Sequence, residues 1–465
     1  MRKHRRITAA VACTVLLPFW AQAADWQNLF NGRNLDGWQV LGGEATYEVR
    51  SGVIVGTAVP DTPNTFLTTE ARYDDFIFEA EVKIDGTLNS GFMFRADSRP
   101  DYRNGVVYGY QAEIDPSRRA FSGGIYEEQR RGWLYVPTRN PECRAKFKPG
   151  EWNAYRIEAI GNSIRTWVNG FPCARLIDGD IAEGFIGLQV HGVRNARNGQ
   201  PGDTASWRKL RILTGNLEAA RWPMPDETVE VHYAPNTLSD WEKAQGWKLL
   251  WDGETTGGWR GAKIDGFPDR GWSIEDGQLI VEASGGGEAR HGGDIITSEE
   301  FTEFEVQVDF KITEGANSGI KYFVDPDLLK GEGSAIGLEF QILDDERHPD
   351  AKLGVAGNRT MGSLYDLITA ANLSEITRTG KRVNPPGSWN RARIVVKGKN
   401  VEHWLNDFKV VEYQRGTQMY RALVAYSKYA QWPNFGEWES GPILLQDHGD
   451  RVAFRSIKIR DLSSE

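Results

Sequence analysis

The sequence predicts an all-β protein built from two β-sandwich domains of the jelly-roll type in tandem. Six sequence blocks recur in the same order along the chain, two of them at a spacing of 228 residues. Within each repeat, apolar and polar residues alternate with period two, as in strands that bury one face. The chain also contains 51 Gly and 17 Trp residues. Many turns and many aromatic side chains favour β structure, and Trp-rich β proteins often bind sugars.

Residues 1–24 have the pattern of a secretory signal peptide. Four positive charges precede an apolar run over residues 7–20, and Ala21-Gln22-Ala23 fits a small-residue cleavage site. The run is shorter than the roughly 20 apolar residues of a membrane-spanning helix, and no later stretch approaches that length. We therefore expect a periplasmic or secreted protein without a transmembrane segment. Removal of the leader lowers the formal net charge from −9 to −13. This acidity argues against nucleic-acid partners.

The two repeats are expected over residues 25–215 and 247–463. The matching blocks include LFNGRNLDGW (29–38) and LWDGETTGGW (250–259), FIFEAEVKIDGTLNSG (76–91) and FEVQVDFKITEGANSG (304–319), and WNAYRIEAIGNSIRTWVNG (152–170) and WNRARIVVKGKNVEHWLND (389–407). Their alternating runs predict strands, and Asn162-Ser163 and Lys399-Asn400 are typical of hairpin turns between them. Many short antiparallel strands in about 200 residues fit a two-sheet sandwich.

Residues 216–246 are predicted to form an ordered linker. Ser239 and Glu242 have the spacing of a capping box that opens one or two helical turns. The segment also contains Trp222, Tyr233 and Trp241, which argue against a floppy tether and for packing on the domains.

Two cysteines, Cys143 and Cys173, remain after the leader. Export to an oxidising compartment permits one disulfide between them, but the sequence does not give their separation. There is no CxxC pattern, so a cysteine-based zinc site is not expected.

A strand in each repeat carries an acid and an amide on one face. Alternation places Glu339 and Gln341 together, while the apolar residues between them face the core. In the first repeat the order is exchanged, with Gln111 and then Glu113. Asp344 follows at the end of the second-repeat strand. This pattern indicates a polar, concave, substrate-binding surface, and ordinary solvated strand residues are the alternative.

Each repeat also contains a histidine in an L-Q-x-H-G segment near its end. His191 follows Gln189 in the first repeat, and His448 follows Gln446 in the second. Histidine is the natural general base near neutral pH, which makes this position a candidate catalytic site. A structural histidine that holds a loop is the alternative.

Other candidates come from one repeat or differ between the two. His403 could be a second proton-transfer group or a plain strand residue, because the first repeat has Thr166 there. Lys321 could stabilise negative charge on a carbonyl oxygen or be a surface lysine. Arg95 is the nearby cation of the first repeat.

A tyrosine stands at an expected loop mouth in both repeats. Tyr365 and Asp366 are matched by Tyr126 and an acid after it. Such residues suit sugar stacking and hydroxyl binding, and they equally suit loop anchoring.

Several enzyme signatures are absent from the sequence. It has no HExxH, GxSxG or P-loop motif, and no GxGxxG after a strand. The E-x-D-x-x-E pattern of sandwich glucanases is incomplete in both repeats. Two-carboxylate glycoside hydrolysis therefore fits poorly, although an acid near Glu339 could still supply the second carboxylate.

Taken together, these blocks resemble the 3-keto-disaccharide hydrolase domain family, long catalogued as a domain of unknown function. The resemblance covers about 26–214 and 247–462, and the segment ending in LQDHG is its most specific part. It implies two concanavalin A-like jelly-roll β-sandwiches in tandem, each with a sugar site on its concave sheet. It also implies exported proteins that cleave 3-keto-glycosides, which a separate sugar 3-dehydrogenase produces.

That resemblance makes a mechanism arguable. A ketone at C3 acidifies the C2 proton, so a base can remove it, the C1 aglycone can leave by β-elimination, and water can add to C1. His448 or Glu339 would be the base, Lys321 or a bound divalent metal would stabilise the oxyanion, and His403, Tyr365 and Asp344 would assist. No cofactor is certain from the sequence. A non-catalytic, lectin-like pair of glycan-binding modules remains the alternative.

Overall fold

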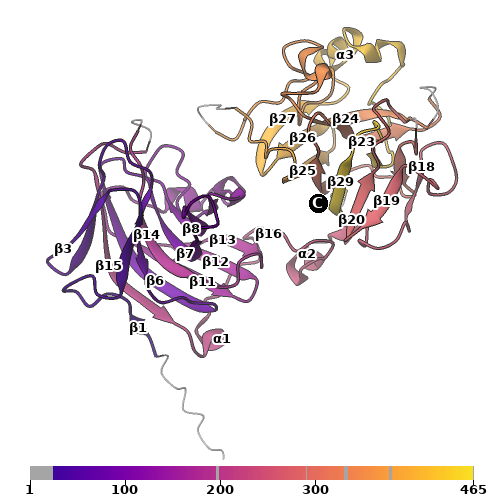
Figure 1. The fold of residues 1–465 in the computed structure, drawn as a ribbon. Helices are drawn as coiled ribbons and strands as arrows, with labels where there is room; N and C mark the ends of the chain where they lie inside the picture. Colours follow the sequence, from indigo (N-terminus) through magenta and orange to yellow (C-terminus); the bar gives the residue numbers. More distant parts are fainter. Residues whose placement is uncertain (1–24, 195–197, 290, 329–332, 376–379, 464–465) are drawn as a thin grey trace, which may run out of the picture.

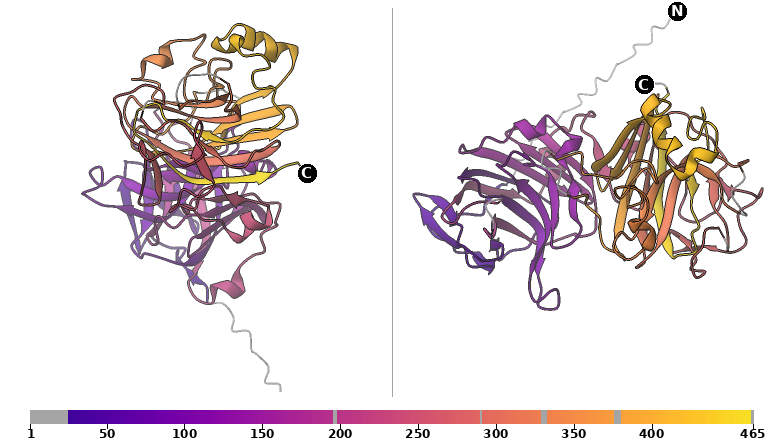
Figure 2. Two further views of the ribbon diagram at one scale, coloured as in Figure 1. Left: turned by 90° about the vertical axis from the view of Figure 1, so that its right-hand side faces the viewer. Right: turned by 90° about the horizontal axis from the view of Figure 1, so that it is seen from above.

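The computed structural model describes residues 25–194, 198–289, 291–328, 333–375 and 380–463. It forms two β-sandwiches that lie next to each other in the chain and in space (Figures 1 and 2). The chain therefore has the predicted fold of two concanavalin A-like jelly rolls in tandem. The expected leader, 1–24, lies outside the described residues. Within them, no helix is long and apolar enough to cross a membrane.

The first sandwich pairs a nine-stranded sheet with a seven-stranded sheet. The nine-stranded sheet contains, in spatial order, β16 (Glu230–His232), β13 (Phe171–Ile177), β12 (Ser163–Val168), β11 (Asn153–Ile160), β6 (Phe76–Asp85), β15 (Thr204–Leu213), β4 (Val53–Thr57) and β3 (Thr46–Arg50), and β1 (Gln27–Asn28) pairs with β15. The other contains β10 (Gly132–Tyr135), β9 (Ile125–Glu128), β8 (Val107–Ile114), β7 (Ser90–Ser98), β14 (Phe185–Val190), β5 (Thr65–Thr69) and β2 (Trp38–Gly42).

The second sandwich pairs an eight-stranded sheet with a five-stranded sheet. The eight-stranded sheet contains β19 (Trp272–Glu275), β20 (Gln278–Val281), β29 (Val452–Asp461), β22 (Phe304–Ile312), β25 (Trp389–Lys397), β26 (Asn400–Leu405) and β27 (Phe408–Gln414), and β17 (Lys248–Leu249) pairs with β29. The five-stranded sheet contains β18 (Trp259–Gly261), β21 (Ile295–Thr297), β28 (Leu444–Leu445), β23 (Asn317–Asp325) and β24 (Ile336–Leu343). The helices are α1 (Leu217–Ala220), α2 (Asp240–Ala244) and α3 (Gln418–Ala425), with 3-10 turns at Pro137–Arg139, Cys143–Ala145, Pro349–Lys352 and Lys428–Gln431.

The repeated sequence blocks make the same contacts in both sandwiches. The indole N–H of Trp38 donates to the carbonyl of Leu29 at 2.8 Å, and that of Trp259 donates to Leu250 at 2.7 Å. Each bond closes the same loop, which ends at the G-W dipeptide. The predicted hairpins are present, but their two-residue turns lie one residue earlier, since β12 begins at Ser163 and β26 at Asn400.

The linker residues 216–246 contact both domains. Strand β16 pairs in parallel with β13 of the first domain, in sheets whose other ladders are antiparallel. Helix α2 begins with the predicted capping box, because Ser239 Oγ accepts from the N–H of Glu242 while the Glu242 carboxylate accepts from the N–H of Ser239. Glu242 then pairs with Lys458 of the second domain.

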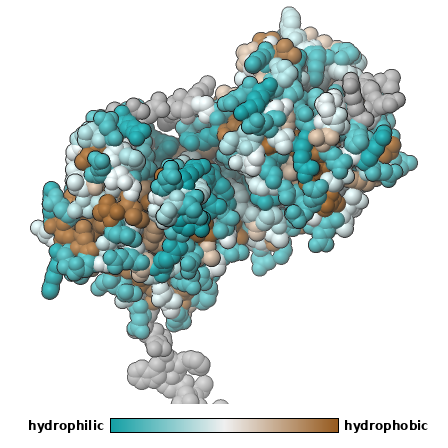
Figure 3. Space-filling model, in the orientation of Figure 1, coloured by the Kyte–Doolittle hydropathy of each residue, from teal (hydrophilic) through white to brown (hydrophobic). Residues whose placement is uncertain are grey.

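A second contact joins the two domains directly. Arg139 of the first domain pairs with Asp407 of the second, and the two side chains are 10% and 2% exposed. Phe121 and Trp133 pack with Phe408 in one buried cluster. The face in Figure 3 is mostly hydrophilic and is hollowed where the domains meet.

The two mature cysteines form a disulfide. Cys143 and Cys173 have Cα atoms 5.2 Å apart and are separated by 30 residues in sequence. The bond ties the 3-10 turn at Cys143–Ala145 to β13, at the edge of the first domain nearest the linker.

Candidate functional site

A buried lysine lies opposite an acid on the five-stranded sheet of the second domain. Lys321 of β23 is the register partner of Glu339 of β24. Lys321 Nζ lies 3.3 Å from Asp294 Oδ2 and 3.5 Å from Glu288 Oε1, and the side chain is 2% exposed. Burial lowers the pKa of Lys321, but the charges of Asp294, Glu339 and Glu288 outweigh it and raise this pKa above its ordinary value. The sheet therefore holds a permanent positive charge beside Glu339.

The glycine of the repeated N-S-G block makes room for the site. A Cβ atom on Gly319 would lie 2.4 Å from Glu339 Oε1, which is closer than real contacts allow. In the first domain, a Cβ on Gly91 would meet the side chain of Gln111 at 2.3 Å. Glycine thus lets the acid or amide of the next strand lie flat across it. As predicted, Gln341 shares the face of Glu339, while Leu338, Phe340 and Ile342 are in the core.

The L-Q-x-H-G segments are fixed by the same hydrogen bond in both domains. Ser318 Oγ donates to the carbonyl of Gln446 at 2.8 Å, and Ser90 Oγ donates to that of Gln189 at 2.7 Å. In the second domain, Gln446 Nε2 donates to Glu288 Oε1 at 3.2 Å. Gln446 therefore lies beside the Lys321 cluster.

His448 lies farther along the same face. Its ring centroid is 6.2 Å from that of His348, and His448 Nδ1 has no hydrogen-bond partner within the described residues. Burial and the neighbouring His448 lower the pKa of His348. Asp447, the residue before His448, donates its N–H to Asp294 Oδ1 at 3.0 Å, and Asp294 is also the partner of Lys321. The segment that carries His448 is therefore attached to the lysine cluster through Asp294.

Tyr365 anchors the loop above Glu339. Its hydroxyl donates to Asp350 Oδ2 at 2.7 Å, and its N–H donates to the carbonyl of Glu339 at 3.0 Å. Lys428 Nζ lies 3.9 Å from the ring centroid of Tyr365. Asp366 accepts from Arg359 and from the N–H of Lys428, so the structure gives it a loop-anchoring position.

Asp344 stabilises a turn and does not meet Glu339. Its carboxylate accepts from the backbone N–H groups of Gly315, Glu346 and Arg347. Burial raises its pKa, but these donors outweigh burial and hold the pKa below its ordinary value. It lies five residues beyond Glu339 on an extended chain, about 16 Å away. In the described part of the chain, no group of three or more His, Cys, Asp or Glu side chains has the arrangement of a metal site.

The structure contradicts the prediction that His403 is a proton-transfer group. His403 is fully buried between the sheets, where its ring lies 5.0 Å from that of Phe340, on the core side of β24. With its proton assigned to Nδ1, it donates to the carbonyl of Gly362 at 3.1 Å and accepts from Tyr322 at Nε2. In the first domain, Thr166 donates to the equivalent carbonyl of Gly123. Burial lowers the pKa of His403 to about 4, so it is a neutral tether.

The first domain carries an open cavity on the face of its seven-stranded sheet. Its volume is about 860 Å³, and Gln111, Glu113, Tyr126, Gln189 and His191 all line it. The structure therefore brings these five predicted residues together. His191 Nδ1 bonds the carbonyl of Gly192 at 2.9 Å, and Asn198 bonds its Nε2 at 3.3 Å. Burial lowers the pKa of His191.

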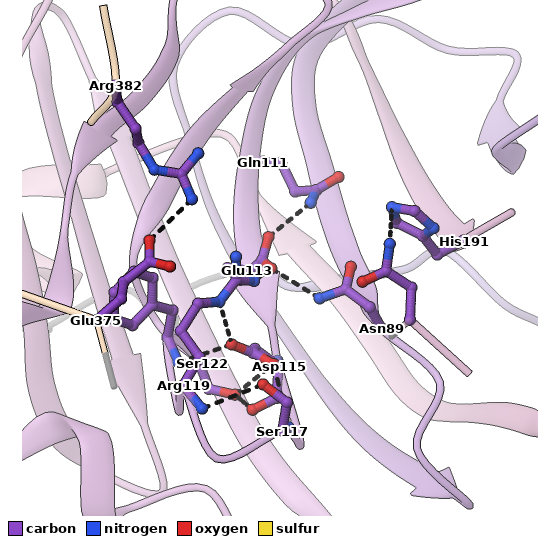
Figure 4. A network of polar contacts seen from close by, with 12 residues as sticks. Asn89, Gln111, Glu113, Asp115, Ser117, Arg119, Ser122, His191, Glu375 and Arg382 are labelled. Carbon is purple, nitrogen blue, oxygen red and sulfur yellow. Dashed lines mark hydrogen bonds and ion pairs between the residues drawn. The ribbon is translucent and has the colours of Figure 1, made fainter. Parts of the chain in front are cut away.

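Glu113 is the central acid of this cavity (Figure 4). It accepts from Asn89 at 2.8 Å, from Gln111 at 2.9 Å and from Arg119 at 3.1 Å. Burial raises the pKa of Glu113 to about 7, with Asp115 adding to the rise and the charge of Arg119 opposing it. A carboxyl group with this pKa exchanges protons near neutrality.

Arg95 is not part of the cavity. Its guanidinium donates to the carbonyls of Asp74 and Gly161 and to Asp75 Oδ1, and the side chain is 1% exposed. Arg95 therefore holds the β11–β12 turn in place, and the prediction that it binds substrate is wrong.

Comparison with known proteins assigns the family. The 3-keto-alpha-glucoside-1,2-lyase-like domain model matches residues 25–213 and 246–460. The chain belongs to this family. It is 38% identical over 239 residues to a 3-keto-disaccharide hydrolase of Bacteroides thetaiotaomicron, covering 47% of this chain and 79% of the relative.

Among solved structures, the chain is similar to a protein provisionally described as a glycosyl hydrolase from Parabacteroides distasonis, at 29% identity and a TM-score of 0.42, covering 50% of this chain and 100% of that one. It is also similar to a carbohydrate-binding module of Bacillus subtilis, at 17% identity and a TM-score of 0.28, covering 38% of this chain and 95% of the module.

Sequence reasoning missed several residues of both sites. Glu288 and Asp294 come from a loop that has no repeated motif, so nothing in the sequence indicated that these two acids would pair with Lys321. Asn89 and Asn317, by contrast, begin the repeated N-S-G block and could have been found there. Arg382 of the second domain lines the first-domain cavity, and only the packing of the domains reveals it.

Proposed function

We propose that the second domain cleaves 3-keto-glycosides by proton abstraction at C2 followed by elimination of the C1 aglycone. The observation that carries this proposal is the buried Lys321 ammonium facing Glu339 across adjacent strands. Chemistry beside a ketone needs a base together with a charge that stabilises the enolate oxygen. Glu339 and Lys321 supply one of each on a single face.

Glu339 takes the C2 proton, and the C–H electrons form a C2–C3 double bond with negative charge on O3. Lys321 stabilises that charge more strongly than water would, because the site is buried. The enolate then re-forms the C3 carbonyl, a C1–C2 double bond forms, and the C1–O1 bond breaks. The proton on Glu339 passes to O1 of the aglycone, and addition of water across C1 and C2 completes a net hydrolysis.

Family membership and the relative's activity support this substrate class. The 3-keto group requires a preceding oxidation of the C3 hydroxyl, so the protein would act after a separate sugar 3-dehydrogenase. We place it in the periplasm or outside the cell. The leader-like residues 1–24 and the Cys143–Cys173 disulfide support this location, because disulfides persist in oxidising compartments.

A variant that displaces the Glu339 carboxylate without removing it tests the proposal. Gly319→Ala puts a methyl group 2.4 Å from Glu339 Oε1, and the flexible end of that side chain can move away. We expect a folded protein whose turnover of 3-keto-trehalose falls by at least about 100-fold, as in Glu339→Gln, because a positioned base contributes that much. Melting temperature and circular dichroism check the fold.

Gly91→Ala is the matched control, because it displaces Gln111 at the equivalent position of the first domain. It should leave turnover unchanged. Equal losses in both variants would mean that the reaction needs both domains. No turnover of any 3-keto-glycoside by folded wild-type protein would favour the glycan-binding alternative.

A further inference from the structure

The outer face of the eight-stranded sheet in the second domain is covered by the linker. Lys458 of β29 alternates with core residues, so its side chain points outward, where it pairs with Glu242 of α2. Near it, Asn236 Oδ1 accepts from the backbone N–H of Ser456 at 2.8 Å. The acidic turn Asp240–Ala244 therefore lies against this sheet as a docked segment.

The first domain has a matching cation on the outer face of its nine-stranded sheet. Arg211 of β15 is the register partner of Glu79, and Lys458 of β29 is the register partner of Gln307. Positions 79 and 307 are 228 residues apart, which is the spacing of the repeats. Arg211 therefore occupies the position at which the second domain binds its linker turn.

At this position the first domain has an open groove. The groove has a volume of about 560 Å³ and crosses β11, β6 and β15. Trp222 is 39% exposed and forms the wall on the β12 side, where its ring centroid lies 5.9 Å from that of Trp167. On the β15 side, the ring centroid of Trp26 lies 4.4 Å from the guanidinium carbon of Arg211. In the described part of the chain, no helix precedes Trp26 as α2 precedes Trp247, so this groove lacks the turn that covers the second domain.

The groove carries more positive than negative charge. Four basic side chains share two carboxylates, in the pairs of Glu79 with Arg156 and Arg211 and of Glu81 with Arg208 and Lys209. Arg156 also contacts Glu158, but the charge of Glu158 is matched by Arg221. The groove therefore has an excess of two positive charges on a chain whose formal net charge is negative. Lys209 is 66% exposed and Arg211 is 46% exposed, so both can reach a further carboxylate.

We propose that this groove is a docking site for an acidic peptide segment of a partner protein, which lies on the first domain as the linker turn lies on the second. Carboxylates of the segment pair with Lys209 and Arg211, and the exposed ring of Trp222 contacts its apolar side chains. The groove and the cavity of Glu113 belong to opposite sheets of the first sandwich, so docking leaves that cavity open. The site does not depend on the cleavage reaction that we assign to the second domain.

Fluorescence anisotropy with a labelled peptide of residues 236–247 tests the site, because this segment lies on the equivalent face of the second domain. We expect the peptide to bind the mature chain, and to bind more weakly as salt is added, because the charges that it contacts are exposed. The same peptide with Asn at position 240 and Gln at position 242 should not bind.

Charge reversal in the groove should weaken this binding. Arg211→Glu and Lys209→Glu each place a carboxylate opposite the acidic peptide, so each should lower its affinity by at least about 10-fold. Arg50→Glu is the matched control, because Arg50 is 60% exposed on β3 of the same sheet and does not line the groove. It should leave the affinity unchanged. Circular dichroism checks that all three variants are folded.

Several results would overturn the proposal. They are no binding at peptide concentrations up to about 1 mM, unchanged affinity in both groove variants, or tighter binding of polygalacturonate than of the peptide. Self-association of the wild type that is lost in Arg211→Glu, measured by sedimentation, would instead make this face an interface between copies of the chain. Turnover of 3-keto-trehalose is measured on the same proteins and should not differ between wild type and the groove variants, so a failure of the cleavage reaction shows separately.

Discussion

The ionisation of Glu113 should make the stability of the first domain depend on pH. The side chain is 4% exposed, and burial raises its pKa from 4.5 to about 7. The folded state therefore disfavours the carboxylate, while the unfolded chain ionises freely. Below pH 4.5 the carboxyl group is protonated in both states, and its ionisation does not lower the free energy of unfolding. As the pH rises through 7, the loss of unfolding free energy becomes complete, and the pKa shift corresponds to a loss of about 3 kcal/mol.

Replacing Glu113 with Gln removes the titration while keeping the shape. Urea denaturation from pH 4.5 to pH 8 should show that the variant's stability relative to wild type rises by about 3 kcal/mol over this range. Glu151→Gln is the control, because this carboxylate is 68% exposed in the same domain. A stability difference between Glu113→Gln and wild type that stays constant with pH would refute a buried carboxyl group with a raised pKa.

Three further changes test the architecture. Replacing Cys143 and Cys173 with Ser should lower the first domain's unfolding free energy by about 3.5 kcal/mol, given the 30-residue loop, and equal urea midpoints would contradict this. His403→Thr should keep the hydrogen bond to the loop, lower the free energy of unfolding by about 2 kcal/mol and leave turnover within about twofold of wild type. A large loss of turnover would instead show that His403 takes part in the reaction. Arg139→Ala leaves Asp407 buried and unpaired, so calorimetry should show about 3 kcal/mol of destabilisation and separated unfolding transitions of the two domains.

The sequence was sufficient for the fold because repetition and alternation report local geometry. Period-two alternation placed Glu339 and Gln341 on one face and Phe340 in the core, and the structure agrees. The capping box at Ser239 was also readable, since it depends on residues three apart. These features require no knowledge of distant contacts.

The sites were only partly predictable, because alternation does not tell which sheet a strand joins. His403 alternates correctly, but its strand lies in the eight-stranded sheet, so its ring points into the core from the opposite layer. Arg95 sits at a strand irregularity with a positive φ of 43°, which turns it away from the expected face. Arg382 reaches the first-domain cavity from another domain, and no local pattern encodes such a contact.

Turnover of 3-keto-trehalose beside trehalose tests the central claim most directly, with wild type, Glu339→Gln and Lys321→Met compared under identical conditions. Lys321→Met keeps the length of the side chain and removes the charge that faces Glu339. We predict cleavage of the keto sugar alone, and at least about 100-fold loss in both variants with the fold retained. Cleavage of unoxidised trehalose, or full activity in either variant, would contradict a proton abstraction carried out by this pair.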